Sequence, residues 1–141
     1  MPGAMVAQAL FVVGAAVLGL LGALHLAFTF FTPNFEARNP ATSAAMRADH
    51  PRLTRRTSLW DAWVGFNVSH SLGALLFAGV YLLLALGHMA VLRDSMALAW
   101  LAPAGGAAYL AIAVRYWFRT PLIGIAVATA CFTGAALMLQ L

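Results

Sequence analysis

Four long apolar segments follow one another along the chain, separated by shorter polar stretches. They cover about residues 5–31, 59–87, 96–115 and 121–141. Each contains the roughly 20 residues that an α-helix needs to cross about 30 Å of hydrocarbon at about 1.5 Å per residue. Backbone N–H and C=O groups in lipid must be paired internally, so the pattern predicts helices. We expect an all-α fold, an integral membrane four-helix bundle in which residues 1–141 form a single domain.

The composition agrees with lipid as the solvent of most of the chain. Of the 141 residues, 63% are apolar and only 9% are charged. A soluble domain carries about 25% charged residues, so too little polar surface is present to cover a water-soluble globule. The single cysteine, Cys131, lies inside an apolar segment and excludes an intrachain disulfide.

The basic residues, all of them arginines, predict the orientation of the spans. The connection over residues 32–57 contains five arginines and the one over 115–120 contains two, whereas the opposite face has only Arg93. Short loops rich in arginine stay in the cytoplasm. We therefore expect both loops to be cytoplasmic and both termini to lie outside, an N-out/C-out topology. The net charge is +4, and the arginines that give it lie beside apolar spans. We therefore expect them to contact lipid phosphates and not nucleic acid.

Local signals predict where some helices begin. Ser58 and Asp61 have the spacing of a helix cap at the start of the second span. Thr120 followed by Pro121 predicts the start of the fourth span, with the proline in the first helical position. Within the first polar connection, Asn39-Pro40 predicts a short surface helix that ends before Pro51.

Two histidines lie inside spans, at nearly the same predicted depth. Counted from the cytoplasmic ends of their spans, His25 and His70 differ by two residues, or about 3 Å. Asn67 shares a helix face with His70, and Tyr109 on the third span reaches a similar depth. We expect the first two spans to lie side by side, with His25 near Asn67 and His70.

Small residues recur every four positions in the same two spans, a spacing that lets helix backbones approach closely. The runs are Ala15, Gly19 and Ala23 in the first span and Gly65, Ser69 and Gly73 in the second. We expect both runs to take part in the packing of the two spans against each other.

Two interpretations of the polar side chains follow. In the first, they only form interhelical hydrogen bonds, which average about 0.6 kcal/mol in membranes. In the second, His25, Asn67, His70 and Tyr109 bind a cofactor, because intramembrane ionisable residues often mark sites. Two facing neutral imidazoles, His25 and His70, can ligate a b-type haem, bind a metal ion or hydrogen-bond a quinone. Two histidines are too few for a closed zinc site, and we favour the interpretation without a cofactor.

Two segments, Leu21-Gly-Ala-Leu-His25 and Trp60 to Gly73, resemble those of small bacterial four-helix membrane proteins. The resemblance covers most of the chain in layout, but its specific part is confined to these two segments. It implies a bacterial inner-membrane location and no particular activity. The second segment is also loosely similar to histidine-bearing helices of membrane cytochrome b anchors. The residues around the histidine do not match those helices, so no haem ligand is carried over.

Three classes of function remain. The favoured one is a structural or interaction bundle that assembles with itself or with a partner membrane protein. The second is a membrane redox subunit that uses His25 and His70. The third is a small transporter, which the absence of an acidic residue from the interior of a span disfavours. The sequence contains no nucleophile–base pair or metalloprotease motif, so we expect no catalytic residue and do not favour an enzyme.

Overall fold

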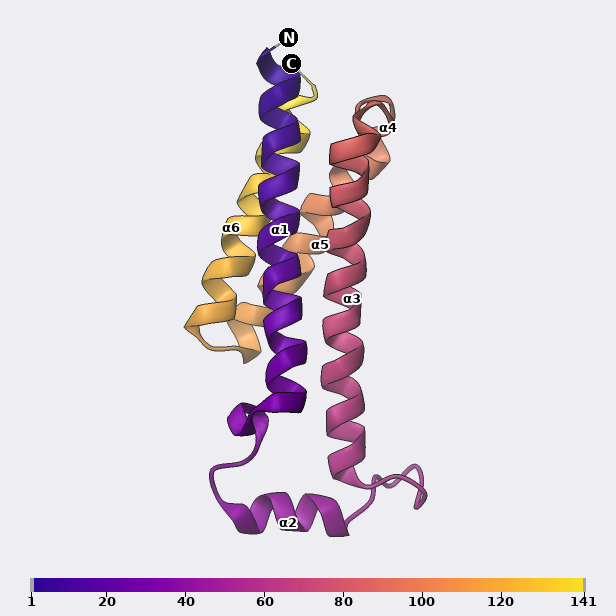
Figure 1. Cartoon of the computed structure of the whole chain (residues 1–141), viewed down its shortest axis with the longest axis vertical. Helices are drawn as coiled ribbons and strands as arrows, with labels where there is room; N and C mark the ends of the chain where they lie inside the picture. The colour runs from indigo at the N-terminus through magenta and orange to yellow at the C-terminus, as the bar shows by residue number, and fades with distance from the viewer. Residues whose placement is uncertain (1, 141) are drawn as a thin grey trace. The chain divides into compact units, whose positions relative to one another are not determined.

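The computed structural model describes residues 2–140, in which every regular element is a helix (Figure 1). In chain order these are α1 (Pro2–Phe31), the 3₁₀ turn η1 (Pro33–Phe35), α2 (Pro40–Ala48), α3 (Leu59–Gly87), α4 (Met89–Asp94), α5 (Met96–Tyr116) and α6 (Arg119–Met138). Helices α1, α3, α5 and α6 are long and apolar enough to cross a membrane. The prediction of an all-α fold with four membrane-spanning helices is confirmed.

Side-chain caps fix the start of two helices where the sequence predicted them. Ser58 Oγ accepts a hydrogen bond from the Asp61 backbone N–H at 3.0 Å and donates to the Asp61 carboxylate at 2.7 Å, just before α3. Asn39 Oδ1 accepts from the Ala41 N–H at 3.0 Å, and Pro40 takes the first position of α2. In both cases a polar side chain satisfies an N–H group that has no partner inside the helix.

Helix α6 begins earlier than the Thr120-Pro121 pair predicted. Its first residue is Arg119, its cap residue is Phe118, and no side chain caps it. Pro121 therefore lies inside the first turn. The prediction of the boundary was wrong because proline is tolerated where the backbone N–H groups have no intrahelical acceptor, and so it does not mark one position.

The chain divides into two compact units. The larger comprises Met1–Leu21 and Ala74–Leu141, and the smaller comprises Gly22–Gly73. Both α1 and α3 continue without interruption from one unit into the other. The assignment of the whole chain to a single transmembrane domain stays a prediction.

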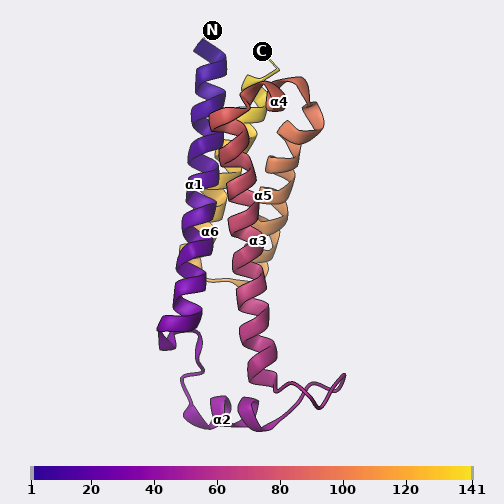
Figure 2. The same cartoon turned by 45° about the vertical axis from the view of Figure 1, so that its right-hand side comes forward.

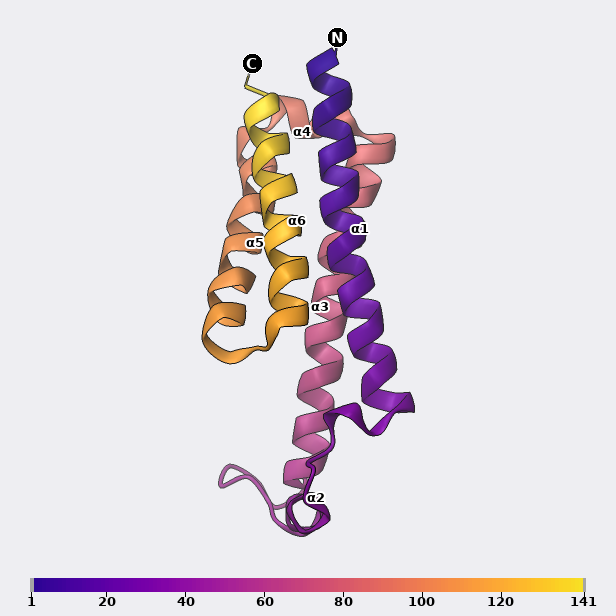
Figure 3. The same ribbon diagram turned by 90° about the vertical axis from the view of Figure 1, so that its left-hand side faces the viewer.

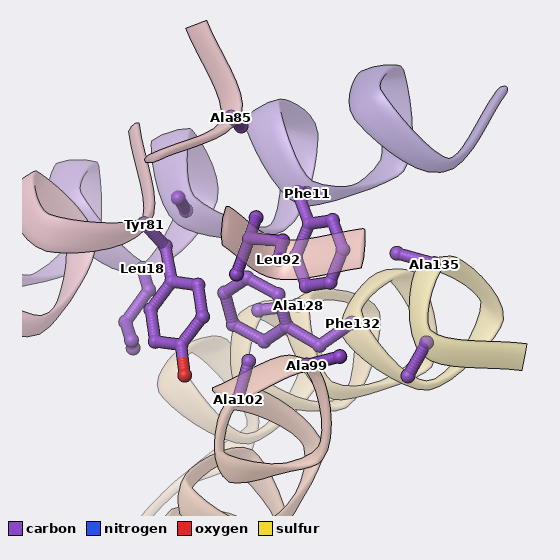
Figure 4. Close-up of a cluster of buried hydrophobic side chains, with 12 residues drawn as sticks. Phe11, Leu18, Tyr81, Ala85, Leu92, Ala99, Ala102, Ala128, Phe132 and Ala135 are labelled. Atoms are coloured by element: carbon purple, nitrogen blue, oxygen red, sulfur yellow. The ribbon is translucent and has the colours of Figure 1, made fainter. Parts of the chain in front are cut away.

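In the larger unit, parts of all four spans surround an aromatic core filled out by alanines. Phe11 of α1 and Phe132 of α6 are fully buried, with ring centroids 6.3 Å apart. Tyr81 of α3 stacks on Phe11 at 6.0 Å, and Figure 4 shows the three rings pointing toward one another. Buried alanines from α1, α3, α5 and α6 complete the cluster: Ala15, Ala85, Ala99, Ala102, Ala128, Ala135 and Ala136. Such small side chains let the helix axes approach, which gives packing contacts that lipid itself does not drive.

The order of the helices in this unit is an up-and-down one. Helix α1 begins and α6 ends at the same end, where α4 also leads the chain from α3 into α5 (Figures 2 and 3). The connection from α5 to α6 lies at the opposite end. Helices α5 and α6 pack along each other, and a Cβ atom added at Gly106 of α5 would lie 2.7 Å from Thr129 Oγ1 of α6. Close contact between these two spans therefore requires glycine at this position.

In the smaller unit, η1 and α2 lie between the end of α1 and the start of α3. Helix α2 runs crosswise to both helix segments, as expected of a surface helix (Figures 1 and 3). Arg47 of α2 lies 3.6 Å from the Glu36 carboxylate, and its guanidinium lies 3.9 Å from the centroid of the Trp60 ring. Trp63 Nε1 donates to the Phe35 carbonyl at 3.3 Å. These contacts tie η1 and α2 to the first turns of α3.

Candidate functional site

His25 and Asn67 join α1 to α3 within the smaller unit. His25 Nε2 lies 2.8 Å from Asn67 Oδ1. Asn67 Nδ2 donates to the Trp63 carbonyl at 2.8 Å, which leaves Oδ1 facing the imidazole. Because an amide oxygen only accepts, the His25 ring carries its proton on Nε2 and donates it to Asn67.

His70 adds a second imidazole to the first. The ring centroids of His25 and His70 are 5.2 Å apart, and the rings meet edge to face at 69°. His70 follows Asn67 by three residues, which places both on one side of α3. His25 therefore lies beside both residues with which the sequence predicted contact. We call His25, Asn67 and His70 the histidine cluster.

Phe35 covers the His25 ring from the connection after α1. Its ring centroid lies 4.4 Å from that of His25, with the planes inclined by 34°. The 3₁₀ turn that carries Phe35 is capped by Thr32, whose Oγ1 accepts from the Asn34 N–H at 3.3 Å. This contact was missed in the sequence, because it lies outside every span. The signal was the Thr32-Pro33-Asn34 tripeptide, which is typical of a tight turn.

Neighbouring hydroxyl groups bond the backbone carbonyls of the cluster. Ser71, which is fully buried, donates to the Asn67 carbonyl at 2.9 Å. Thr29 donates to the His25 carbonyl at 2.8 Å. Both bonds join residues four apart in one helix, the usual way in which a hydroxyl is satisfied inside a span. Asn67 is buried as well, so the polar face of α3 that Asn67 and His70 share points inward.

The second run of small residues does not pack as expected. Gly65, Ser69 and Gly73 are exposed, and a Cβ atom added at Gly65 would meet nothing within 4 Å. The reason is periodicity: side chains two apart on a helix point in different directions, so this run and the polar face cannot both face inward. In the larger unit, a Cβ atom at Gly19 of α1 would instead lie 3.2 Å from the Ala78 methyl group of α3.

Tyr109 belongs to the larger unit, in which it lies half-buried on α5. The histidine cluster belongs entirely to the smaller unit. The participation of Tyr109 in the cluster therefore stays a prediction.

The cluster offers few free metal-binding atoms. Within residues 2–140, no group of three or more His, Cys, Asp or Glu residues could hold a metal ion. Of the two candidate ligands, His25 and His70, His25 already uses its Nε2 atom in the hydrogen bond with Asn67. Two imidazoles bound to opposite sides of a haem iron, with metal–nitrogen bonds of about 2 Å, hold their ring centroids roughly 6 Å apart. The observed 5.2 Å, edge to face, means that haem ligation would require the rings to separate.

Comparison of the chain with protein-family models, with curated proteins and with solved structures finds no significant match.

Proposed function

We propose that this protein is a multi-pass scaffold of the bacterial inner membrane that works by lateral association with another transmembrane surface. That surface belongs to a second copy of the chain or to a partner membrane protein. The observation that carries the proposal is the exposed run of Gly65, Ser69 and Gly73 on α3. Residues four apart share one helix face, and a face of small side chains is the kind of surface on which membrane helices pack.

The surroundings of this run support the same interpretation. A Cβ atom at Gly65 would meet no neighbour within 4 Å, so the face is open within the chain itself. Large apolar side chains border it, with Phe66 68% exposed and Leu72 48% exposed. Small residues between large ones give a groove-and-ridge surface that favours another helix over mobile acyl chains.

The histidine cluster has a structural role in this proposal. The donors and acceptors of its hydrogen bonds all belong to the smaller unit: His25 bonds Asn67, and Asn67 bonds the Trp63 carbonyl. Bonds of this kind are worth about 0.6 kcal/mol each in membranes, but they fix the register of two helices. The cluster thus holds α3 in the rotation that presents its small-residue face outward.

The proposal includes an orientation. The arginine-rich connections over residues 32–57 and 115–120 lie in the cytoplasm, and both termini point outward. The excess of arginine in these two connections supports this, because positive juxtamembrane loops are retained on the cytoplasmic side.

Site-specific crosslinking in native membranes tests the association. Ser69→Cys is prepared in a Cys131→Ala background, and Val127→Cys, on an exposed position of α6, is the matched control. We expect Ser69→Cys to form a covalent adduct, either at twice the monomer mass or with another protein, and Val127→Cys to form much less. Adding Gly65→Ile and Gly73→Ile should abolish the adduct. Equal crosslinking at both positions, or none at Ser69→Cys, would overturn the proposal.

A second candidate is a cofactor-binding redox subunit, because His25 and His70 bring two imidazoles together, with ring centroids 5.2 Å apart that would have to separate to ligate a haem iron. Protein purified in mild detergent is examined by a reduced-minus-oxidised visible spectrum and by metal analysis. A stoichiometric haem or metal that is lost in His25→Ala and His70→Ala, and kept in the loop variant His50→Ala, would establish this function. A spectrum without haem, in a preparation without metal, would remove it.

A further inference from the structure

The loop between α2 and α3, residues 49–58, is closed at its base by two hydrogen bonds. The Leu59 N–H donates to the Asp49 carbonyl at 2.9 Å. His50 Nδ1 donates to the Thr57 carbonyl at 3.0 Å. The two ends of the loop are therefore held together just before α3 begins. We call residues 49–58 the arginine loop.

The tip of the arginine loop is ordered by its own backbone. The Thr54 N–H donates to the Pro51 carbonyl at 3.1 Å, which closes a four-residue turn. Thr54 Oγ1 then accepts from the Arg56 N–H at 3.1 Å. A turn built in this way presents its side chains from a fixed backbone, which loses little further freedom when the loop binds a ligand.

The tip carries three positive charges and no negative one. Arg52, Arg55 and Arg56 are exposed, and residues 50–57 contain no Asp or Glu. The ion pairs of the described residues join Arg47 to Glu36 and Arg93 to Asp94, so neither uses an arginine of the tip. Three guanidinium groups are thus available to an anion from outside the chain.

The exposure of Leu53 indicates which kind of anion the arginine loop binds. Leu53 lies between Arg52 and Arg55 in the sequence, and its side chain is 95% exposed, the most exposed of the large apolar side chains described. A soluble phosphate makes no use of such a side chain, whereas a lipid surface combines phosphate groups with acyl chains directly below them. The position also fits, because the loop ends where the apolar helix α3 starts, and α2 runs crosswise beside it (Figure 1).

We infer that the arginine loop is a binding site for anionic phospholipid headgroups. Arg52, Arg55 and Arg56 contact the phosphate oxygens, for which the planar guanidinium offers paired donors. Leu53 inserts at the boundary between headgroups and acyl chains. The inference rests on the membrane location proposed above for residues 32–57 and adds the ligand that this connection binds.

Lipid titration of the full-length protein tests the inference. Delipidated protein in detergent is titrated with phosphatidylglycerol or phosphatidylcholine, and bound lipid is counted by native mass spectrometry. Removing the tip charges by Arg52→Gln, Arg55→Gln and Arg56→Gln should weaken phosphatidylglycerol binding about fivefold per arginine, or about a hundredfold together. Phosphatidylcholine binding should not change. The matched control removes the same charge elsewhere by Arg38→Gln, Arg115→Gln and Arg119→Gln, and should change binding less than about fivefold.

Further variants separate the lipid from a free anion. Leu53→Ser should weaken phosphatidylglycerol binding, and millimolar inorganic phosphate should not displace the lipid. Displacement by phosphate, together with indifference to Leu53→Ser, would assign the loop to a soluble anion and overturn the inference. Equal losses in the two triple variants would also overturn it, since total charge would then explain the binding.

Two controls test whether these outcomes arise from lost charge and not from misfolding. A triple replacement of the tip arginines by lysine keeps the charge and should retain more affinity than the glutamine variant, and thermal unfolding shows whether each variant is folded. Because binding in detergent does not depend on orientation, a finding that residues 32–57 lie outside the cytoplasm would refute the proposed topology alone.

Discussion

Asn67 is the residue on which the histidine cluster depends most. It is 5% exposed, and its amide bonds both His25 and the Trp63 carbonyl. Asn67→Leu keeps the volume but leaves the imidazole N–H without its acceptor. We expect a loss of about 1–2 kcal/mol in the free energy of unfolding, measured by denaturation with SDS in mixed micelles. Asn34→Leu, at an exposed position in η1, is the control and should change little; equal losses would contradict the role assigned to Asn67.

Ser43 of α2 presents the opposite case. Its side chain is 6% exposed, and its hydroxyl is the one buried side-chain polar atom in the described residues that has no hydrogen-bond partner. Ser43→Ala should therefore leave stability unchanged or raise it by up to about 1 kcal/mol, because a desolvated hydroxyl is removed and alanine favours helix. Ser71→Ala, which removes the bond to the Asn67 carbonyl, should destabilise in the same thermal or SDS assay. A destabilising Ser43→Ala would indicate a partner for this hydroxyl outside the described chain.

Part of the histidine cluster could be predicted from the sequence. The proximity of His25, Asn67 and His70 followed from counting residues inward from the polar ends of two spans, since helical rise is regular. Phe35 could not be found in this way. It reaches the cluster through the turn η1 in the connection, whose path depends on tertiary contacts that no periodicity encodes.

The glycines within the helices differ according to what faces them. A Cβ atom at Gly14 of α1 would lie 2.9 Å from Phe132 Cε1 and 3.1 Å from the Ala128 carbonyl oxygen. A Cβ atom at Gly79 of α3 would meet nothing within 4 Å. Gly14→Ala should therefore destabilise by about 1–3 kcal/mol through overpacking. Gly79→Ala should be neutral or stabilising by up to about 1 kcal/mol, because alanine favours the helix. The SDS-induced unfolding curves of the two variants check this, and a shift in the same direction would contradict it.

Helix boundaries and helix faces were predictable to different degrees. The four spans could be predicted from their length and apolarity, and the first residues of α2 and α3 from the polar cap before each helix. The start of α6 could not be predicted, because a proline near a helix start is compatible with several positions. The short elements η1 and α4 could not be predicted either, because a single turn has no periodicity. The outward orientation of the Gly65 run could not be predicted. Helix α3 has both a polar face and a face of small residues, and only packing decides which of them points inward.

The orientation of the protein in the membrane can be tested directly. Alkaline phosphatase fused after Met138 of α6 should be active, because the proposed topology exports that end of the chain. The same enzyme fused after Ala48 of α2 should be inactive, whereas a fluorescent protein fused there should be bright. The reverse pattern in well-expressed fusions would contradict the assignment of residues 32–57 to the cytoplasm.

The four spans differ in length, and this has a consequence for the histidines. Helices α1 and α3 contain 30 and 29 residues, whereas α5 and α6 contain 21 and 20. At about 1.5 Å per residue the first pair measures about 45 Å and the second about 30 Å, which is close to the hydrocarbon thickness of a bilayer. The longer pair is therefore mismatched to that thickness and must tilt or extend among the headgroups. His25 lies about 9 Å from the end of α1, so we expect the length of the surrounding acyl chains to change how much water reaches its imidazole.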